Sequence, residues 1–243
     1  MDTKFKVIVP FYNCEEWILK CVRSVVDQID KNCEVILIND ASTDNTEKII
    51  RDTFLLGDRV KYIKNENNVG ALENIVTTIA SLSDPEDVIV LLDGDDWLAH
   101  NNVFTMLKEI YSDPNIWLTY GQYENLSKKY RGICAQLTNT RRYRKRHWVT
   151  SHLRTFKKHI WDKIKDEDLK DSSGNYYPMA WDLAFMYPMV EMAGLKRIKY
   201  IRDILYIYND QNPINDDKKN RQLQIDLGSE IKKKPVYDEI IFR

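Results

Sequence analysis

The sequence predicts an α/β fold built on an open, mostly parallel sheet with helices on both faces. Two observations point to it. Short apolar runs alternate with segments of helical periodicity through the first half of the chain, which predicts parallel strands joined by right-handed crossovers. The run VIVLL at 88–92 contains no polar residue, as expected for a strand that is covered on both faces.

The elements of the first half follow in order. Strands are expected at the apolar runs 5–12, 34–40, 59–65 and 87–93. Helices are expected between them and beyond, at 14–28, 42–54, 70–82 and 102–111, before a strand at 117–123. Asn13 and Glu16 predict a capping box for the first helix, and Asp44 or Ser42 a cap for the second.

The second half of the chain is less regular. Residues 152–164 predict an amphipathic helix, and residues 180–194 predict another that Pro188 should kink or end. Residues 195–210 predict one or two strands, and the polar last 30 residues or so are expected to be largely mobile. The sequence therefore predicts one domain with a C-terminal extension.

Composition narrows the functional classes. The formal net charge of −1 over 243 residues gives no indication of a nucleic-acid partner. No apolar run approaches the roughly 18–20 residues of a transmembrane helix, and the N-terminus does not resemble a signal peptide.

The four cysteines lack zinc-ligand spacing and are expected to be buried free thiols. The four histidines are expected in surface or packing roles. A cytoplasmic protein, or one on the cytosolic face of a membrane, is expected.

Polar side chains follow three strands of the predicted sheet. Asn13 follows the first, Asp40 the second, and the acidic turn Asp93-Gly94-Asp95-Asp96 the fourth. The carboxyl ends of these strands meet at the edge where open sheets bind ligands. The chain has no glycine-rich phosphate loop, neither GxGxxG nor GxxxxGK[ST], so a nucleotide diphosphate bound here would need a cation. Carboxylates suit Mg²⁺ or Mn²⁺; the alternative is an unoccupied acidic turn.

Four motifs, in this order and spacing, resemble those of glycosyltransferase family 2 with its GT-A fold: VIVPFYN, INDASTDNT, NVGALENI and LLDGDDWL. The resemblance covers about residues 4–125. It implies a Rossmann-like sheet of GT-A type, divided into a nucleotide-sugar-binding half at 1–125, an acceptor-binding half at 126–210 and a partly mobile extension at 211–243. The chain departs from the family pattern at Asn39, Ala41 and Glu73.

The resemblance also implies an activity. It is the metal-dependent, inverting transfer of one sugar from a UDP-sugar to a glycan, glycoprotein or lipid-linked acceptor, with Mn²⁺ or Mg²⁺ as cofactor. The sequence lacks the QxxRW motif and the membrane helices of processive members, which favours a non-processive enzyme. A sugar nucleotidyltransferase and a catalytically silent nucleotide-binding module remain as alternatives.

Individual roles follow from the resemblance. Asp40 would accept a hydrogen bond from the imide N–H of the base, and Asp95 would coordinate the metal beneath the diphosphate. Asp93 would meet the ribose or the metal, and Asp217 is the candidate for a further metal ligand. The residues expected at the nucleotide are Pro10, Tyr12, Asn13, Asp40, Asn74 and Asp93.

The acceptor half should supply the general base. Asp182, beside Trp181 at a helix start, is expected to take the proton of the acceptor hydroxyl. Its alternative role is a cap or a buried structural carboxylate, and Glu191 and Asp203 are the other candidate bases.

Two further sets of cations have open interpretations. Arg154 and Lys157 are expected to face the diphosphate or acceptor, or else solvent. The basic run RRYRKRHW at 141–148 either contacts an anionic acceptor or a membrane face, or is a solvated or disordered loop that orders over the donor, which the pattern favours.

Overall fold

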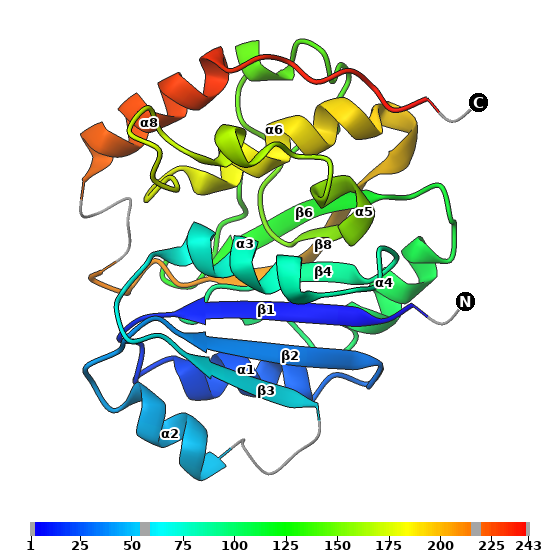
Figure 1. Ribbon diagram of the computed structural model, residues 1–243. Helices are drawn as coiled ribbons and strands as arrows, with labels where there is room; N and C mark the ends of the chain where they lie inside the picture. The colour runs from blue at the N-terminus through cyan, green and yellow to red at the C-terminus, as the bar shows by residue number, and fades with distance from the viewer. Residues whose placement is uncertain (1–2, 54–58, 215–219, 242–243) are drawn as a thin grey trace.

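The computed structural model describes residues 3–53, 59–214 and 220–241 of the chain. Its strands in the first hundred residues are β1 (Phe5–Phe11), β2 (Cys33–Asn39), β3 (Val60–Lys64), β4 (Val88–Leu91) and β5 (Trp97–Leu98). The later strands are β6 (Leu118–Asn125), β7 (Arg154–Lys157) and β8 (Ile198–Tyr208). They form one sheet in the order β3-β2-β1-β4-β7-β6-β8-β5 (Figure 1).

The sheet has a parallel part and a mixed part. Strands β3, β2, β1 and β4 are parallel neighbours, as the alternating pattern predicts. Strand β7 then pairs antiparallel with both β4 and β6, and β6 pairs parallel with β8. The predicted α/β class, with an open, mostly parallel sheet and a less regular second half, is confirmed.

Helices cover both faces of this sheet. Those of the first half are α1 (Ile18–Val26), α2 (Thr46–Thr53), α3 (Ala71–Ser81) and α4 (Val103–Tyr111). Those of the second half are α5 (Lys158–Trp161), α6 (Trp181–Ala193) and α8 (Arg221–Lys233). Within the described residues, no helix has the length and apolar character needed to cross a membrane.

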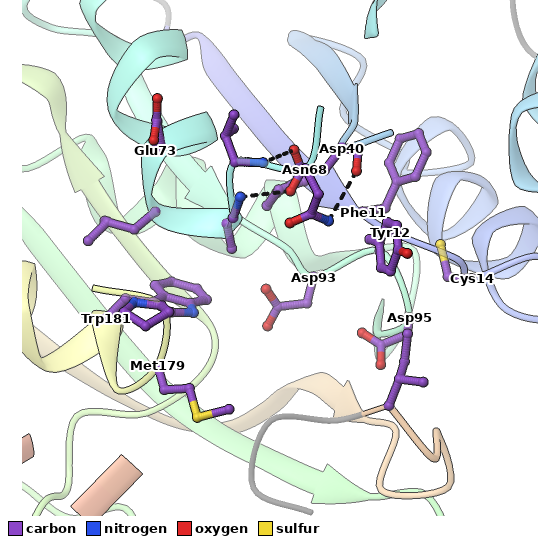
Figure 2. Close-up of a pocket in the computed structure, with 18 of the residues that line it drawn as sticks. Phe11, Tyr12, Cys14, Asp40, Asn68, Glu73, Asp93, Asp95, Met179 and Trp181 are labelled. Atoms are coloured by element: carbon purple, nitrogen blue, oxygen red, sulfur yellow. Dashed lines mark hydrogen bonds between the residues drawn. The ribbon is translucent and has the colours of Figure 1, made fainter. Parts of the chain in front are cut away.

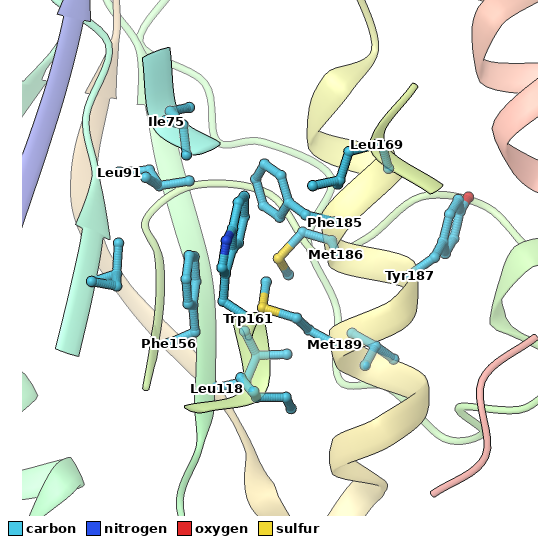
Figure 3. Packing of buried hydrophobic residues seen from close by; sticks show 14 of the residues in the cluster. Ile75, Leu91, Leu118, Phe156, Trp161, Leu169, Phe185, Met186, Tyr187 and Met189 are labelled. Atoms are coloured by element: carbon cyan, nitrogen blue, oxygen red, sulfur yellow. The ribbon is translucent and has the colours of Figure 1, made fainter. Parts of the chain in front are cut away.

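Alternating side chains of the strands feed two hydrophobic cores. Val7 and Val9 of β1 pack with residues of α1 and α4, whereas Ile8 packs on the opposite face with residues of α3 and α6. Successive side chains of a strand point to opposite faces, so one buried strand serves both cores. Figure 3 shows the second core, where Phe156 and Phe185 lie in the same aromatic group.

The capping box predicted for the first helix does not form. Helix α1 begins at Ile18, and no side chain caps it. The side chain of Asn13 instead accepts a hydrogen bond from the Thr43 N–H at 2.7 Å. Asn13 therefore ties the end of β1 to the segment that follows β2. Asp44 does act at the start of the second helix, where its carboxylate accepts from the Thr46 N–H at 3.0 Å.

The helix predicted at 152–164 is wrong over its first half. Residues 154–157 form β7, and only Lys158–Trp161 are helical. All four residues of β7 are buried, although two of them are cations. Each cation has a carboxylate partner from a distant segment: Arg154 pairs with Asp182 and Lys157 with Glu86. The alternation of charged and apolar residues at 154–157 resembles the polar face of a helix, but both charged side chains are buried in a strand and paired with carboxylates of other segments.

Two further expectations concern the second half of the chain. Helix α6 does not end at Pro188 but runs on to Ala193. Most of its residues are buried, and this packing stabilises the helix across the proline. Helix α8, which the polar composition did not predict, buries Leu227 and Ile231 against the second core. The side chain of Asn220 caps it by accepting from the Leu223 N–H at 3.1 Å. These contacts replace much of the mobile extension that the sequence predicts.

A buried ion pair joins α6 to the basic run. The Arg144 guanidinium donates to both Glu191 carboxylate oxygens, at 2.6 and 2.8 Å, and both side chains are 5% exposed or less. Replacing Glu191 by Ala leaves a buried guanidinium without its counter-charge, so we expect the free energy of unfolding to fall by about 3–5 kcal/mol. Urea denaturation of the variant and the unmodified chain measures this difference in the free energy of unfolding.

The control is Glu124→Gln, which breaks the partly exposed Lys129–Glu124 pair at 3.6 Å. It should change the free energy of unfolding by no more than about 1 kcal/mol. Equal losses in the two variants would contradict a special role for the buried pair.

Candidate active site

A cavity of about 650 Å³ opens at the carboxyl ends of β1, β2 and β4. This is the edge where the sequence predicts a ligand. Five predicted site residues line it, namely Pro10, Tyr12, Asp40, Asp93 and Asp95. Figure 2 shows the carboxylates of Asp93 and Asp95 projecting into the space between Tyr12 on one side and Trp181 and Met179 on the other.

Gly94 lets the acidic turn lie directly against β1. Its N–H donates to the Pro10 carbonyl at 3.2 Å. A Cβ placed on Gly94 would lie 2.3 Å from the Cβ of Phe11, a contact that no side chain tolerates. The close approach explains why glycine stands within the turn, and it positions Asp93 and Asp95 at the mouth of the cavity.

The three carboxylates of the turn have different surroundings. Asp96 is buried and accepts from the Tyr206 hydroxyl at 2.5 Å and the Asn209 N–H at 2.6 Å. Asp95 accepts from the Asn212 side-chain amide at 2.7 Å. Asp93 accepts a longer bond from the same Tyr206 hydroxyl at 3.3 Å. Asp96 therefore fixes the turn to the end of β8, and all three residues line the cavity.

Burial makes this cluster of charges costly. Burial is the main cause that raises the pKa of Asp95. Burial, reinforced by the charges of Asp95 and Asp93, raises the pKa of Asp96 well above its usual range. Carboxylates held this close favour a positive charge among them.

The donor atoms at the cavity fit a divalent cation that shares its ligands with a substrate. Asp93 and Asp95 offer the hard oxygen donors that Mg²⁺ and Mn²⁺ prefer. Across 3–53, 59–214 and 220–241, no group of three or more His, Cys, Asp or Glu side chains is placed to hold a metal. Asp217, the candidate for a further ligand, lies outside the described residues. Such a site suits an ion whose remaining ligands are water and nucleotide phosphates.

Asp40 organises the loop that borders the cavity. Its carboxylate accepts from the Val69 N–H at 2.9 Å, the Gly70 N–H at 2.8 Å and the Asn65 side-chain amide at 2.8 Å. A carboxylate has about four acceptor positions, so these three contacts leave room for one more donor. Asp40 thus has a structural role in this loop, and its contact with a base N–H stays a prediction.

Asparagine at position 40 is expected to loosen this loop. In Asp40→Asn an NH₂ group replaces one of the two carboxylate oxygens, so at least one N–H donor of this loop faces another donor and loses its acceptor. We expect the free energy of unfolding to fall by about 1–3 kcal/mol, and hydrogen exchange at the Val69 and Gly70 amides to accelerate. The exposed Asp52→Asn is the control; unchanged exchange at residues 69 and 70 in Asp40→Asn would contradict the assignment.

Two predicted nucleotide contacts lie behind the cavity lining. Asn74 is buried on α3, where it accepts from the Asn65 amide at 2.7 Å and donates to the Gly70 carbonyl at 3.0 Å. Asn13 is bonded to Thr43, as described above. Neither lines the cavity. The structure shows both residues supporting loops that carry lining residues.

The expected base is held by a cation. The Asp182 carboxylate accepts from the Arg154 guanidinium at 2.6 Å. Its side chain is 23% exposed, and it adjoins Trp181, which lines the cavity. Arg154 lies opposite Leu91, at the cavity end of β4. The structure therefore brings Arg154 and Asp182 together as an ion pair.

Lys157 is not brought to the site. It lies opposite Val88, at the other end of β4, and donates to Glu86 at 3.0 Å and to the Pro114 carbonyl at 3.2 Å. Strand β7 runs away from the cavity after Arg154, so Lys157 does not line it, and the contact of Lys157 with the diphosphate or acceptor stays a prediction. Glu191, an alternative candidate for the base, forms a buried ion pair with Arg144.

The sequence pattern missed several lining residues. Asn212, which holds Asp95, comes from the segment after β8, and no motif marked it. Tyr176, Tyr177 and Met179 line the cavity from the loop before α6. The aromatic, proline-containing stretch at 176–181 is the signal that could have indicated them.

A family model described as Glycosyl transferase family 2 matches residues 6–165. Among curated relatives, Glycosyltransferase GlyA of Streptococcus pneumoniae is 35% identical over 111 residues, covering 45% of this chain and 15% of that protein. Glycosyltransferase GlyG of the same species is 30% identical over 128 residues, covering 51% and 40%. The chain thus spans less than half the length of either relative.

Solved structures share the fold. TarS 1–349 of S. aureus, in complex with UDP-GlcNAc, superposes with a TM-score of 0.65 at 19% identity, over 86% of this chain and 59% of that one. The mannosyltransferase PcManGT of Pyrobaculum calidifontis, in complex with GDP-Man and Mn²⁺, gives 0.56 at 17% identity, over 86% and 57%. The fold is of the GT-A type, and the motifs and the family match agree: the chain belongs to glycosyl transferase family 2.

Proposed function

We propose that this glycosyltransferase moves one sugar from a UDP-sugar to a hydroxyl of a glycan, glycoprotein or lipid-linked acceptor, with inversion and with Mn²⁺ or Mg²⁺ as cofactor. The observation that carries the proposal is the grouping of Asp40, Asp93 and Asp95 around one cavity at the carboxyl ends of three adjacent strands. The cavity volume lies in the range of small-molecule sites.

The donor is proposed to lie along this edge of the sheet. Its base would lie near Tyr12 and Asp40, and its diphosphate near Asp93 and Asp95. The complexes of TarS with UDP-GlcNAc and with UDP support a uridine nucleotide. The GDP-Man complex of PcManGT supplies the alternative base that an assay must test.

The acidic turn is proposed to hold the cation. When bound, a divalent cation stabilises the negative charge of the leaving diphosphate. Asp93 and Asp95 would hold it, and Asn212 orients Asp95 through its 2.7 Å hydrogen bond. The buried Asp96 keeps the turn in place by its bonds to Tyr206 and Asn209.

Asp182 is proposed to accept the proton of the acceptor hydroxyl as that oxygen attacks the anomeric carbon from the face opposite the diphosphate. Arg154 fixes the carboxylate at the start of α6, beside Trp181. The aromatic lining from Tyr176 to Trp181 would form the wall against which the sugar and acceptor lie.

We also propose a division of the chain and a cellular location. The division into a donor half at 1–125, an acceptor half at 126–210 and an extension at 211–243 follows the motifs. A cytoplasmic location, or one on the cytosolic face of a membrane, is supported by the four buried free thiols, which suit a reducing compartment.

Donor hydrolysis tests the proposal without a known acceptor. The purified chain is incubated with individual UDP-sugars, and with GDP-mannose as the matched nucleotide control, with Mn²⁺ or with EDTA. We expect nucleotide release from one UDP-sugar that requires the metal. Release from GDP-mannose alone would contradict the uridine assignment, and pyrophosphate release from UTP and a sugar 1-phosphate would indicate a nucleotidyltransferase.

A further inference from the structure

The positive charge of this chain is concentrated in one segment. Residues 125–161 contain eleven Lys and Arg and no Asp or Glu, in a protein whose formal net charge is −1. Such local asymmetry produces a field that the overall charge conceals. The question is whether other segments neutralise these cations.

Some of the cations are neutralised, and others are not. Five have a carboxylate partner elsewhere in the chain, namely Lys129, Arg144, Arg154, Lys157 and Lys158. Arg142, Lys145 and Arg146 are exposed and have no ion-pair partner within residues 3–53, 59–214 and 220–241. These three, with His147, line a second cavity of about 750 Å³.

Buried anchors hold the unpaired cations in place. The Tyr143 hydroxyl accepts from the Val149 and Thr150 N–H groups at 2.9 and 3.0 Å, and Arg144 is bound to Glu191 of α6. Residues 143 and 144 thus point inward, and their neighbours on both sides face solvent. Residues Tyr143–Lys145 of the basic run form a short 3₁₀ turn that these anchors fix to the domain, while the exposed cations beside it remain solvated, as the sequence favours.

Neutral hydrogen-bonding groups complete the cavity. Gln136, Thr138 and Asn139 line it together with the cations. Asn139 also fixes the turn, because its side-chain oxygen accepts from the Arg142 N–H at 2.9 Å. A concave site that combines guanidinium groups with directional neutral donors fits a discrete anion with several oxygens better than it fits a flat charged surface.

We propose that this second cavity binds the phosphate groups of a soluble ligand that carries more than one phosphate. Arg142, Lys145 and Arg146 supply the charge, and Gln136, Thr138 and Asn139 supply hydrogen bonds. The site is separate from the donor cavity, since the two share no lining residue. The proposal does not depend on the proposed sugar transfer, because the first cavity is lined by aspartates and the second by cations.

Isothermal titration calorimetry with inorganic tripolyphosphate, in low-salt buffer with EDTA, tests the proposal. We expect saturable binding that weakens as NaCl is raised. The double variant Arg142→Gln/Arg146→Gln should lose at least about tenfold in affinity, because two charge-assisted contacts are removed. Asp95→Asn, which alters only the donor cavity, should bind tripolyphosphate like the unmodified chain.

The matched control is Lys128→Gln/Arg131→Gln, which removes two exposed charges of the same segment outside the cavity. An equal loss in this control would overturn the proposal in favour of non-specific attraction. Absence of binding to the unmodified chain would overturn it as well. Sedimentation with phosphatidylglycerol vesicles, without tripolyphosphate binding, would replace it by a membrane contact. A UDP titration with Mn²⁺ on the same samples reports the donor site separately.

Discussion

The variant Asp95→Ala is expected to lose metal-dependent binding of UDP. Asp95 lines the cavity and accepts a hydrogen bond from Asn212, and in the proposed function its carboxylate would hold the cation that accompanies the diphosphate. A bound divalent ion contributes several kcal/mol to charge stabilisation. We therefore expect UDP affinity in Mn²⁺ and metal-stimulated donor hydrolysis both to fall by about a hundredfold or more. Calorimetry with UDP in Mn²⁺ and in EDTA measures the first effect.

The matched control is Asp238→Ala, which removes one exposed carboxylate from the C-terminal segment. It should bind UDP in Mn²⁺ as the unmodified chain does. If the unmodified chain or Asp238→Ala bound UDP equally well with and without metal, the role assigned to the acidic turn would be contradicted. Retained metal dependence in Asp95→Ala would move the cation site away from this residue.

Asp182→Asn is expected to separate binding from chemistry. The asparagine oxygen can still accept the hydrogen bond from Arg154, so the start of α6 should keep its shape and the donor cavity its affinity for UDP. An amide does not take up the proton of an attacking hydroxyl. General bases typically contribute about 10²–10⁴-fold, and we expect donor hydrolysis to fall by at least about a hundredfold at unchanged UDP affinity. Water replaces the acceptor in this assay and needs the same proton acceptor.

Asp203→Asn is the control for the alternative base. Asp203 is exposed on β8 and does not line the donor cavity, so its variant should hydrolyse the donor at the normal rate. Normal hydrolysis by Asp182→Asn, or its loss in Asp203→Asn, would place the base elsewhere. Weakened UDP binding by Asp182→Asn would show that the Arg154–Asp182 pair shapes the donor cavity.

Sequence patterns predicted the parallel strands of the first half and the cavity at their carboxyl ends because their signals are local. Strands β1, β2 and β4 are short apolar runs, and Tyr12, Asp40 and Asp93, which follow them, line the same cavity. What no pattern revealed is that Asp40 is already bonded to Val69 and Gly70. That contact joins two loops far apart in the chain.

The second half could not be predicted in the same way because its charges are paired over long distances. Arg154 and Lys157 read as the polar face of a helix, yet both lie buried in β7 with partners at Asp182 and Glu86. Asn212 reaches Asp95 from beyond β8. Only the fold brings these segments together, so neither spacing nor hydropathy records their contact.

A crystal structure of the chain soaked with UDP and Mn²⁺ tests the central claim most directly, since Mn²⁺ is located by anomalous scattering. The account predicts one manganese peak contacted by Asp95, Asp93 or both, adjacent to the diphosphate, with the uracil near Tyr12 and Asp40. Nucleotide bound away from this cavity, or present in it with no cation at the acidic turn, would contradict the account.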